Sequence, residues 1–246
     1  MGHSNRAGLS MPEAIVLAGG LGTRLSSLLM DRPKAMIEVG GRPFLEIMLD
    51  RLAQSSVARV ILATGHGRET IERHFGNCWG GIEIQYSVET LPLGTGGAVW
   101  KAMKSLSGEE ALVLNGDTIF DVDLAALLSF HRAMAADVTL ALKPMCDFDR
   151  YGTVECLDGR ILAFHEKARM DRGLINGGVY VLNRELPGRY PFPESFSLER
   201  DFLEKMAGQI KIGGFIQDRY FIDIGIPEDY ARARSELARM RFPHTS

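Results

Sequence analysis

A glycine-rich segment near the start of the chain has the composition of a phosphate-binding loop. Three glycines stand within four positions at the start of Gly19-Gly20-Leu21-Gly22-Thr23-Arg24-Leu25, directly after a short apolar run. Such a turn lets backbone N–H groups approach a phosphate, because no Cβ is in the way. The segment is not a Walker A loop, which would need Lys and Ser or Thr after the last glycine. It also departs from the dinucleotide fingerprint, because Leu25 stands where the third glycine belongs.

The remaining interpretation is a nucleotide loop that carries its own cation, Arg24. A second cation, Lys34, follows in Asp31-Arg32-Pro33-Lys34, where Pro33 fixes the backbone just before it. The forked donors of an arginine and the point charge of a lysine together suit a triphosphate and a second phosphate. On an ordinary surface loop either residue alone would be solvated. We therefore predict Arg24 and Lys34 as catalytic residues, and the following as nucleotide-binding residues: Leu17, Ala18, Gly19, Gly20, Gly22 and Thr23.

Two aspartates stand where a sheet could present them to a metal ion. Asp117 directly follows the apolar run Ala111–Asn115, and Asp223 lies within another apolar run, where an unpaired carboxylate would be costly. Carboxylates at the carboxyl edge of a sheet are typical Mg²⁺ ligands. An ordinary turn role for Asp117 stays open, because Asn-Gly-Asp is rich in turn formers. Asp121 and Asp123 are predicted to be a turn residue and a helix cap.

A second glycine-rich loop, Glu89 to Gly97, precedes a predicted helix. Its backbone amides can face the edge of a purine, and Gly94 permits close approach. Guanine offers an acceptor at O6 and donors at N1 and N2, so it would need an amide N–H and a carboxylate or carbonyl. Glu89 is the candidate carboxylate, although a solvated acid is the alternative. The predicted nucleotide-binding residues of this loop are Glu89, Pro92, Gly94 and Thr95.

The elements that must position these residues follow from the apolar periodicity. In the first half, strands alternate with helices. The predicted strands are Ala14–Leu17, Met36–Val39, Val57–Ala63, Ile82–Ser87, Ala111–Asn115 and Val138–Leu142, and the predicted helices are Phe44–Gln54, Arg68–Phe75, Gly97–Leu106 and Asp123–Ala135. The second half is rich in strands. It is predicted to contain a hairpin of Thr153–Cys156 and Ile161–Phe164, strands Leu174–Leu182, Lys211–Phe215 and Tyr220–Ile224, a helix Leu198–Met206, and a last helix from Pro227 to about Met240.

This order predicts an α/β fold with three layers, in which a mostly parallel mixed sheet carries a small antiparallel addition. Ligands of such sheets bind in the crevice at the carboxyl ends of the strands. Residues 11–246 are expected to form a single catalytic domain, preceded by a disordered tail or cloning remnant over residues 1–10. Nothing in the sequence locates an interface, so the oligomeric state stays open, with a homodimer as one alternative.

Composition excludes several classes of protein. The 246 residues are 46% hydrophobic with a net charge of −3, which is typical of a globular chain rather than a disordered one. The balance of 28 basic against 31 acidic residues argues against nucleic acid as a partner. No apolar run approaches the roughly 18 residues of a membrane span, so no membrane partner is expected. Three cysteines without metal-ligand spacing, and no signal peptide, favour a reducing cytoplasm.

The first loop, with Pro33-Lys34 after it, resembles the signature of the sugar-1-phosphate nucleotidyltransferases. The resemblance covers nearly the whole chain, from about Ala14 to Arg241. It implies a Rossmann-like α/β/α sandwich, and a reaction in which a sugar 1-phosphate attacks the α-phosphate of a nucleoside triphosphate and releases pyrophosphate. It also implies that Asp117 and Asp223 share a Mg²⁺ cofactor. Because no covalent enzyme intermediate is needed, positioning and charge neutralisation would supply most of the catalysis.

Three further segments resemble the sugar-binding segments of this family. They are Tyr151-Gly152-Thr153-Val154, His165-Glu166-Lys167 and Ile175-Asn176-Gly177-Gly178. The resemblance implies backbone contacts at Gly152 and Gly177, hydroxyl contacts at Glu166 and Asn176, and a phosphate contact at Lys167. On a continuous strand Glu166 and Lys167 would point to opposite faces, so only a bulge would let both reach the ligand. The glycines after Asn176 have a plain structural alternative, a bulge or tight bend.

The substrates are also given by resemblance. The segment Pro92–Ala98 is similar to that of guanylyltransferases that make GDP-mannose or GDP-heptose. The late segments 176–182, 196–205 and 220–230 are similar to those that use GTP and D-glycero-α-D-manno-heptose 1-phosphate, which implies a product for bacterial capsule, S-layer or lipopolysaccharide glycans. The alternatives are mannose 1-phosphate or a UTP-using relative, a non-catalytic relative that only binds nucleotide sugar, and a dinucleotide-dependent oxidoreductase.

Overall fold

The protein is built on one mixed sheet of ten strands. The computed structural model describes residues 10–20 and 32–237. In spatial order the strands are β10 (Thr153–Leu157), β11 (Arg160–His165), β13 (Ile212–Ile216), β9 (Val138–Phe148), β12 (Met170–Asn183), β7 (Glu110–Asn115), β1 (Glu13–Leu17), β4 (Arg59–Thr64), β6 (Ile82–Val88) and β5 (Cys78–Trp79). Two small antiparallel pairs stand outside this sheet, β2 (Glu38–Val39) with β3 (Arg42–Pro43), and β8 (Thr118–Phe120) with β14 (Phe221–Asp223).

The four strands β7, β1, β4 and β6 are parallel and form one half of the sheet. The chain moves outward from β1 to β4 and β6, and then returns to β7 on the other side of β1. The strand order therefore reverses beside β1. In open α/β sheets the crevice for ligands lies at such a reversal, beyond the carboxyl ends of the strands.

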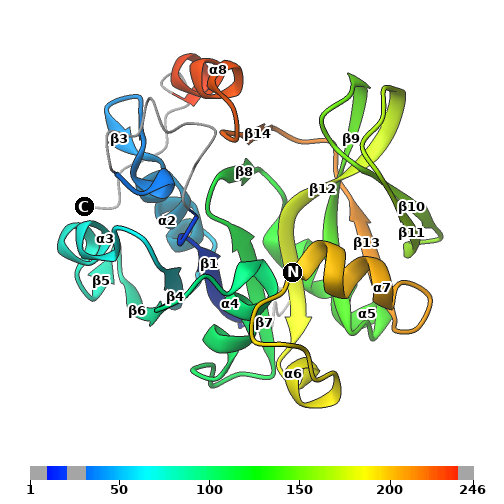
Figure 1. Cartoon of the computed structure of the whole chain (residues 1–246), viewed down its shortest axis with the longest axis horizontal. Coiled ribbons are helices and arrows are strands. Elements are labelled where there is room, and N and C mark those ends of the chain that lie inside the picture. Colours follow the sequence, from blue (N-terminus) through cyan, green and yellow to red (C-terminus); the bar gives the residue numbers. More distant parts are fainter. Residues whose placement is uncertain (1–9, 21–31, 238–246) are drawn as a thin grey trace, which may run out of the picture.

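The other half is mainly antiparallel and lies on the right in Figure 1. β12 is antiparallel both to β7 and to β9, so a single strand joins the two halves. β10 and β11 form the predicted hairpin, whose turn residues Asp158 and Gly159 both have positive φ, +49° and +76°. Two consecutive residues with positive φ are typical of the tight turns that match the twist of a hairpin.

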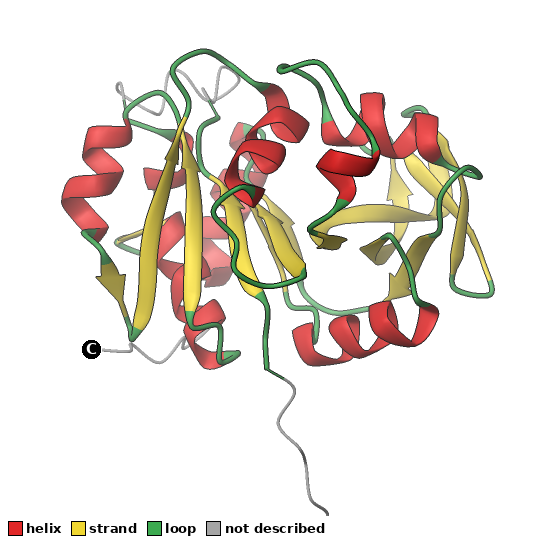
Figure 2. Cartoon of the chain, turned by 90° about the horizontal axis from the view of Figure 1, so that it is seen from below, coloured by secondary structure: helices red, strands yellow, loops and turns green. Residues whose placement is uncertain are grey.

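Helices and loops bury both faces of the sheet (Figures 1 and 2). The helices are α2 (Phe44–Gln54), α3 (Arg68–Phe75), α4 (Gly94–Met103), α5 (Leu124–Met134), α6 (Leu186–Arg189), α7 (Glu204–Met206) and α8 (Pro227–Leu237). Alternate residues of the central strands enter separate cores: Ala14 and Val16 pack with α2 and α3, whereas Ile15 packs with α4. This alternation is the period of a strand with both faces covered. The predicted three-layer α/β fold is confirmed.

Several predicted elements differ in the structure. β9 and β12 are longer than the predicted strands Val138–Leu142 and Leu174–Leu182. The predicted strand Met36–Val39 is a 3₁₀ turn, Lys34–Met36, followed by the two-residue β2, which pairs only with β3. It cannot extend further, because the turn at Gly40 and Gly41 reverses the chain at once. The first part of the predicted helix Leu198–Met206 is a π-helix, Leu198–Leu203. α4 begins at Gly94, three residues before the predicted start at Gly97.

Among the described residues, no helix combines the length and the apolar character that a membrane crossing requires.

Candidate active site

A cavity of about 650 Å³ opens at the carboxyl ends of β1, β4, β6 and β7, at the reversal of strand order. Residues from four loops line it, and most of the predicted nucleotide-binding residues are among them. The lining residues that the sequence singled out are Leu17, Ala18, Gly19, Gly20, Lys34, Glu89, Pro92, Gly94, Thr95 and Asp117. The predicted residues Gly22, Thr23 and Arg24 lie outside the described residues.

The start of the first glycine-rich loop is packed against the start of the second and against Gly65 after β4. A Cβ on Gly19 would stand 3.0 Å from Oε1 of Glu89 and 3.1 Å from the backbone nitrogen of Gly65. A Cβ on Gly20 would meet no described atom within 4 Å. Gly19 is therefore needed for close packing of two loops, whereas Gly20 borders the open cavity.

Glu89 brings a carboxylate into this cavity. It follows β6, where its backbone N–H donates to the carbonyl of Thr64, and its Oε2 accepts the N–H of Leu93 at 3.1 Å. Burial raises the pKa of Glu89, while the Leu93 N–H and the charge of Lys101 oppose the rise. A half-buried carboxylate that faces a cavity can accept hydrogen bonds from a ligand that offers N–H donors.

The second loop packs against Phe196 and against Glu199 at the start of the π-helix. Gly94 has φ of +68°, and a Cβ there would stand 2.5 Å from the carbonyl oxygen of Phe196. The N–H of Gly96 donates to that same carbonyl at 3.0 Å. Thr95 donates its hydroxyl to Oε2 of Glu199 at 2.7 Å. Only glycine tolerates this combination of positive φ and close backbone contact at position 94.

Lys34 and Asp117 meet at the floor of the site. Nζ of Lys34 lies 2.5 Å from Oδ2 of Asp117, and the lysine side chain is only 13% exposed. The position of Lys34 depends on Pro33, whose ring packs so closely on Gly67 that a Cβ there would stand 2.6 Å from it. Lys34, which was predicted to bind phosphate, is thus in direct contact with Asp117, which was predicted to bind a metal ion.

Asp223 stands beside Asp117 on the neighbouring short strand. β14 pairs with β8, and the N–H of Ile224 donates to the carbonyl oxygen of Asp117 at 2.9 Å. Oδ1 of Asp223 accepts the N–H of Gly225 at 2.7 Å, which orients the carboxylate. Burial and the negative charge of Asp117 raise the pKa of Asp223, against the effect of Lys34.

These two carboxylates fit a magnesium ion. They are neighbouring hard oxygen donors, and their mutual repulsion is what a divalent cation would relieve. Within residues 10–20 and 32–237, no group of three or more His, Cys, Asp and Glu side chains is arranged to hold a metal. A two-carboxylate site suits Mg²⁺, which is commonly bound by one or two carboxylates together with substrate phosphates and water.

The predicted sugar-binding residues lie in the other half of the sheet. The register of β12 against β9 shifts between Asn176 and Tyr180, so the glycines after Asn176 form the bulge that the sequence left open. The bulge fixes the side chain of Asn176: Oδ1 accepts the N–H of Gly178, and Nδ2 donates to the hydroxyl of Tyr180 at 2.9 Å. A Cβ on Gly177 would stand 2.3 Å from the ring of Phe120.

Gly152, Glu166 and Lys167 surround the end of the β10–β11 hairpin. A Cβ on Gly152 would stand 2.6 Å from the carbonyl oxygen of His165, so this backbone approach also requires glycine. β11 ends at His165, and Glu166 and Lys167 follow it in an exposed loop. The strand alternation that was expected to separate them therefore does not apply.

Sequence reasoning overlooked two residues of the site. Gly116 was treated only as a turn former, yet a Cβ there would stand 2.3 Å from the carbonyl oxygen of Leu17, so it lets β1 and β7 approach. Asn115 lines the cavity with a buried Oδ1 that has no hydrogen-bond partner among the described residues. Both residues precede Asp117 in a segment that the sequence analysis examined only for its acid.

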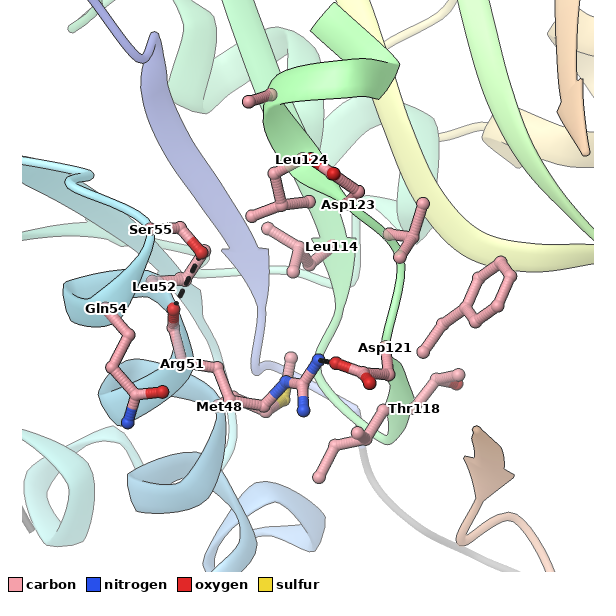
Figure 3. Close-up of a pocket in the computed structure, with 14 residues that line it drawn as sticks. Met48, Arg51, Leu52, Gln54, Ser55, Leu114, Thr118, Asp121, Asp123 and Leu124 are labelled. Carbon is pink, nitrogen blue, oxygen red and sulfur yellow. Dashed lines mark hydrogen bonds and ion pairs between the residues drawn. The ribbon is translucent and has the colours of Figure 1, made fainter. Parts of the chain in front are cut away.

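A second, smaller cavity of about 290 Å³ lies between α2, β8 and the start of α5 (Figure 3). It contains none of the described residues predicted to bind substrate or metal. Asp121 forms an ion pair with Arg51 across it, so this residue is more than the turn former that was expected. Asp123 caps α5 as predicted, because its Oδ1 accepts the N–H of Ala126 at 3.0 Å.

Comparison with known proteins agrees with this architecture. The family model described as nucleotidyl transferase matches residues 13–240. The chain is 49% identical, over 92% of its length and 98% of the relative, to D-glycero-alpha-D-manno-heptose 1-phosphate guanylyltransferase of Aneurinibacillus thermoaerophilus. It is 44% identical to the enzyme of the same name from Campylobacter jejuni, over 89% of this chain and 96% of that one.

A solved structure shares the fold. The crystal structure of HddC from Yersinia pseudotuberculosis complexed with GMP-PN superposes with a TM-score of 0.81 at 34% identity, covering 92% of this chain and 100% of that one. The fold, the cavity at the strand reversal and the family match are consistent with one another. The chain belongs to the nucleotidyl transferase family.

Proposed function

We propose that the protein transfers a guanylyl group from GTP to D-glycero-α-D-manno-heptose 1-phosphate, with release of pyrophosphate. The observation that carries this proposal is the cavity at the strand reversal, which brings together Lys34, Glu89 and Asp117 from three separate loops. Relatives that act on this sugar phosphate by name match the chain over almost their whole length. A cavity of about 650 Å³ is of the size that holds a nucleotide-sized ligand.

Glu89 is assigned the recognition of guanine. Its Oε2 is held by the Leu93 N–H, and its Oε1 faces Gly19 at the border of the cavity. An ionised carboxylate accepts hydrogen bonds from N1 and N2 of guanine, whereas adenine, uracil and cytosine do not present that pair of donors. The backbone amides of residues 92–95 would meet the O6 acceptor.

The chemistry in this proposal is one in-line displacement. A phosphate oxygen of the sugar 1-phosphate forms a bond to the α-phosphorus, the bond from that phosphorus to the bridging oxygen breaks, and pyrophosphate leaves with the electron pair. Lys34 neutralises phosphate charge from the floor of the site. Arg24, which lies outside the described residues, is assigned the role of stabilising the negative charge that develops on the α-phosphate and on pyrophosphate.

Asp117 and Asp223 are assigned a Mg²⁺ ion. When bound, this ion would neutralise phosphate charge and orient the triphosphate. The carboxylates themselves are held for this task by the chain: Gly225 orients Asp223, and the β8–β14 pair keeps the two acids side by side.

Gly152, Glu166, Lys167, Asn176 and Gly177 are assigned the sugar phosphate. Asn176 is already oriented by the bulge of β12, and both glycines allow backbone approach. The GDP-sugar would serve glycosyl transfer into capsule, S-layer or lipopolysaccharide glycans. Because GTP is a cytoplasmic metabolite, the proposal places the reaction in the cytoplasm.

The test is pyrophosphate release across four nucleoside triphosphates and several sugar 1-phosphates, with and without Mg²⁺. Release confined to GTP, the manno-heptose 1-phosphate and Mg²⁺ is the expected result. Preference for mannose 1-phosphate, or for UTP, would overturn the assigned substrate while leaving the reaction class. No release in any mixture would favour a protein that only binds nucleotide sugar.

Lys34→Ala is expected to lower turnover about 10²–10³-fold, the scale of removing one preorganised electrostatic contact. The matched control is Lys104→Ala, because Lys104 is an exposed lysine beyond the end of α4. Turnover of the control should equal that of the wild type. Equal turnover of Lys34→Ala and Lys104→Ala would remove Lys34 from the mechanism.

A further inference from the structure

A chain of hydrogen bonds beneath the cavity connects the two predicted substrate sites. At its centre is Glu199, the second residue of the π-helix. Thr95 donates its hydroxyl to Oε2 of Glu199 at 2.7 Å, and Tyr180 donates its hydroxyl to Oε1 at 3.2 Å. Asn176 in turn donates Nδ2 to the hydroxyl of Tyr180 at 2.9 Å. The chain thus runs from a nucleotide-loop residue to a predicted sugar-binding residue.

Glu199 is held almost entirely by hydroxyl groups. Ser197 supplies a third, at 3.1 Å from Oε2, and no ion pair of Glu199 occurs among residues 10–20 and 32–237 within 4 Å. A partly buried carboxylate without a cation is costly unless hydrogen bonds satisfy it. Tyr180 is fully buried, and burial and the charge of Glu199 raise its pKa well above the ordinary value, so its hydroxyl keeps the proton that it donates.

Further contacts hold both ends of this hydrogen-bond chain. Tyr180 is 0% exposed and belongs to β12, the strand that joins both halves of the sheet. On the nucleotide side, Thr95 accepts the N–H of Leu198 at 2.9 Å, and the carbonyl of Phe196 accepts the N–H of Gly96. Residues 196–199 therefore contact the nucleotide loop through both backbone and side-chain hydrogen bonds. Of the hydrogen bonds named here, only that of Glu199 connects this segment to β12.

We propose that Glu199 is a positioning residue, which sets the distance between the sugar-binding strand and the nucleotide loop through Tyr180 and Thr95. This inference rests on the proposed function, because it concerns the approach of the sugar phosphate to the α-phosphate. In-line transfer needs the reacting atoms close and aligned, and a displacement of about 1 Å can lower the rate about a hundredfold. Glu199 acts on that distance without touching either substrate.

Glu199→Gln is the test, with kcat and both KM values measured. Glutamine keeps the size, but its amide nitrogen donates where a carboxylate oxygen accepted, so either Thr95 or Tyr180 loses the acceptor for its hydroxyl proton. The expected result is a kcat about ten- to a hundredfold lower, with KM for GTP and for the sugar phosphate each within about threefold of wild type. Tyr180→Phe should reproduce this split, and the double variant should be no slower than the slower single one.

Ser197→Ala is the matched control. It also removes a hydroxyl donor from Glu199 and the cap of the π-helix, because Ser197 accepts the N–H of Arg200, but it leaves the path from Thr95 to Tyr180 intact. It should lower the midpoint of thermal unfolding with little change in kcat.

Three results with the variants overturn the proposal. One is a kcat of Glu199→Gln that matches wild type or Ser197→Ala. Another is a raised KM for the sugar phosphate at unchanged kcat, which would make Glu199 a direct ligand. The third is additive losses in the double variant, which would indicate two independent structural effects. A wild-type protein without turnover on any pair of substrates overturns the proposed function and this inference together, whereas unchanged variants of an active wild type overturn only the inference.

Discussion

Lys34 and Asp117 contact each other although 83 positions of sequence separate them. A lysine and an aspartate at 2.5 Å offset each other's charge, so the negative charge next to Asp117 that a cation would neutralise is mainly that of Asp223. Within residues 10–20 and 32–237, by contrast, the carboxylate of Glu89 is stabilised by the backbone N–H of Leu93 on Oε2 and by the more distant charge of Lys101. Burial therefore makes ionisation of Glu89 less favourable in the folded chain than in water.

The effect of Glu89→Gln on the free energy of unfolding is expected to depend on pH. Burial raises the pKa of Glu89 above its ordinary value, so the folded state binds this proton more tightly than the unfolded state does. The stabilisation from that proton is present at low pH and is lost as pH rises through the raised pKa. Glutamine has no charge at any pH. The variant should therefore be more stable than wild type at neutral pH, with a difference that shrinks toward pH 4, measured by denaturant unfolding.

The same variant tests base selection. Loss of a charged hydrogen bond costs about 1.5–3 kcal/mol, so kcat/KM for GTP should fall roughly ten- to a hundredfold. ITP lacks the N2 amino group, so the wild type should prefer GTP to ITP and the variant should lose most of that preference. An undiminished preference for GTP would assign guanine recognition to the backbone amides instead.

At the scale of elements, the loops are held by backbone contacts that only glycine permits. Gly94, at the start of α4, combines a φ of +68° with a carbonyl oxygen 2.5 Å from the place of its Cβ. Gly188 in α6 has neither feature, since its Cβ would meet no described atom within 4 Å. The two positions therefore predict opposite effects of the same substitution.

Gly94→Ala should destabilise the protein by about 1–3 kcal/mol, because strain in φ and displacement of Phe196 add. Gly188→Ala should stabilise it by about 0.4–1 kcal/mol, because alanine restricts the unfolded chain. The free energy of unfolding in denaturant measures both. A Gly94→Ala variant as stable as wild type would show that the backbone at Phe196 can move away from the new Cβ at little cost.

Elements long enough to repeat their apolar pattern several times were predictable from the sequence, whereas the bounds and pairing of the shortest strands were not. The helix Phe44–Gln54 agrees at both ends, because eleven residues display its apolar face several times. β8 contains three residues, too few for any period, and no strand was predicted there. β14 was predicted, as part of the strand Tyr220–Ile224, but its pairing with β8 was not. Asp117 and Asp223 could therefore be proposed from sequence, but their adjacency depends on tertiary pairing. The role of Glu199 was invisible, since its partners lie on α4 and β12.

At the scale of the whole molecule, the alternation of the central strands divides the core between two faces. Ile15 and Ile61 pack on one face and their sequence neighbours on the other, so the sheet is anchored from both sides. The cavity opens at one end of this sheet and is bounded by loops from four of its strands. A ligand there contacts loops that unfolding would separate.

GTP with Mg²⁺ should therefore stabilise the whole fold. At a ligand concentration a hundred times Kd, linkage gives about 2.7 kcal/mol, or roughly 5–10 °C in the unfolding midpoint for a chain of this size. ATP at the same concentration is expected to give a smaller shift, measured by calorimetry. Equal shifts with both nucleotides would mean that the cavity does not select the base.

β12 has a consequence for the exchange of parts between relatives. This strand of 14 residues pairs with β9 along most of its length and with β7 through Val179–Asn183. Consider a chimera in which the sugar-binding half comes from one enzyme, the nucleotide-binding half from another, and the junctions lie in loops. In such a protein β12 of the first enzyme would have to pair with β7 of the second. Recombined genes should encode active proteins only when the residues of those two strands are exchanged together, whatever the similarity of the loops.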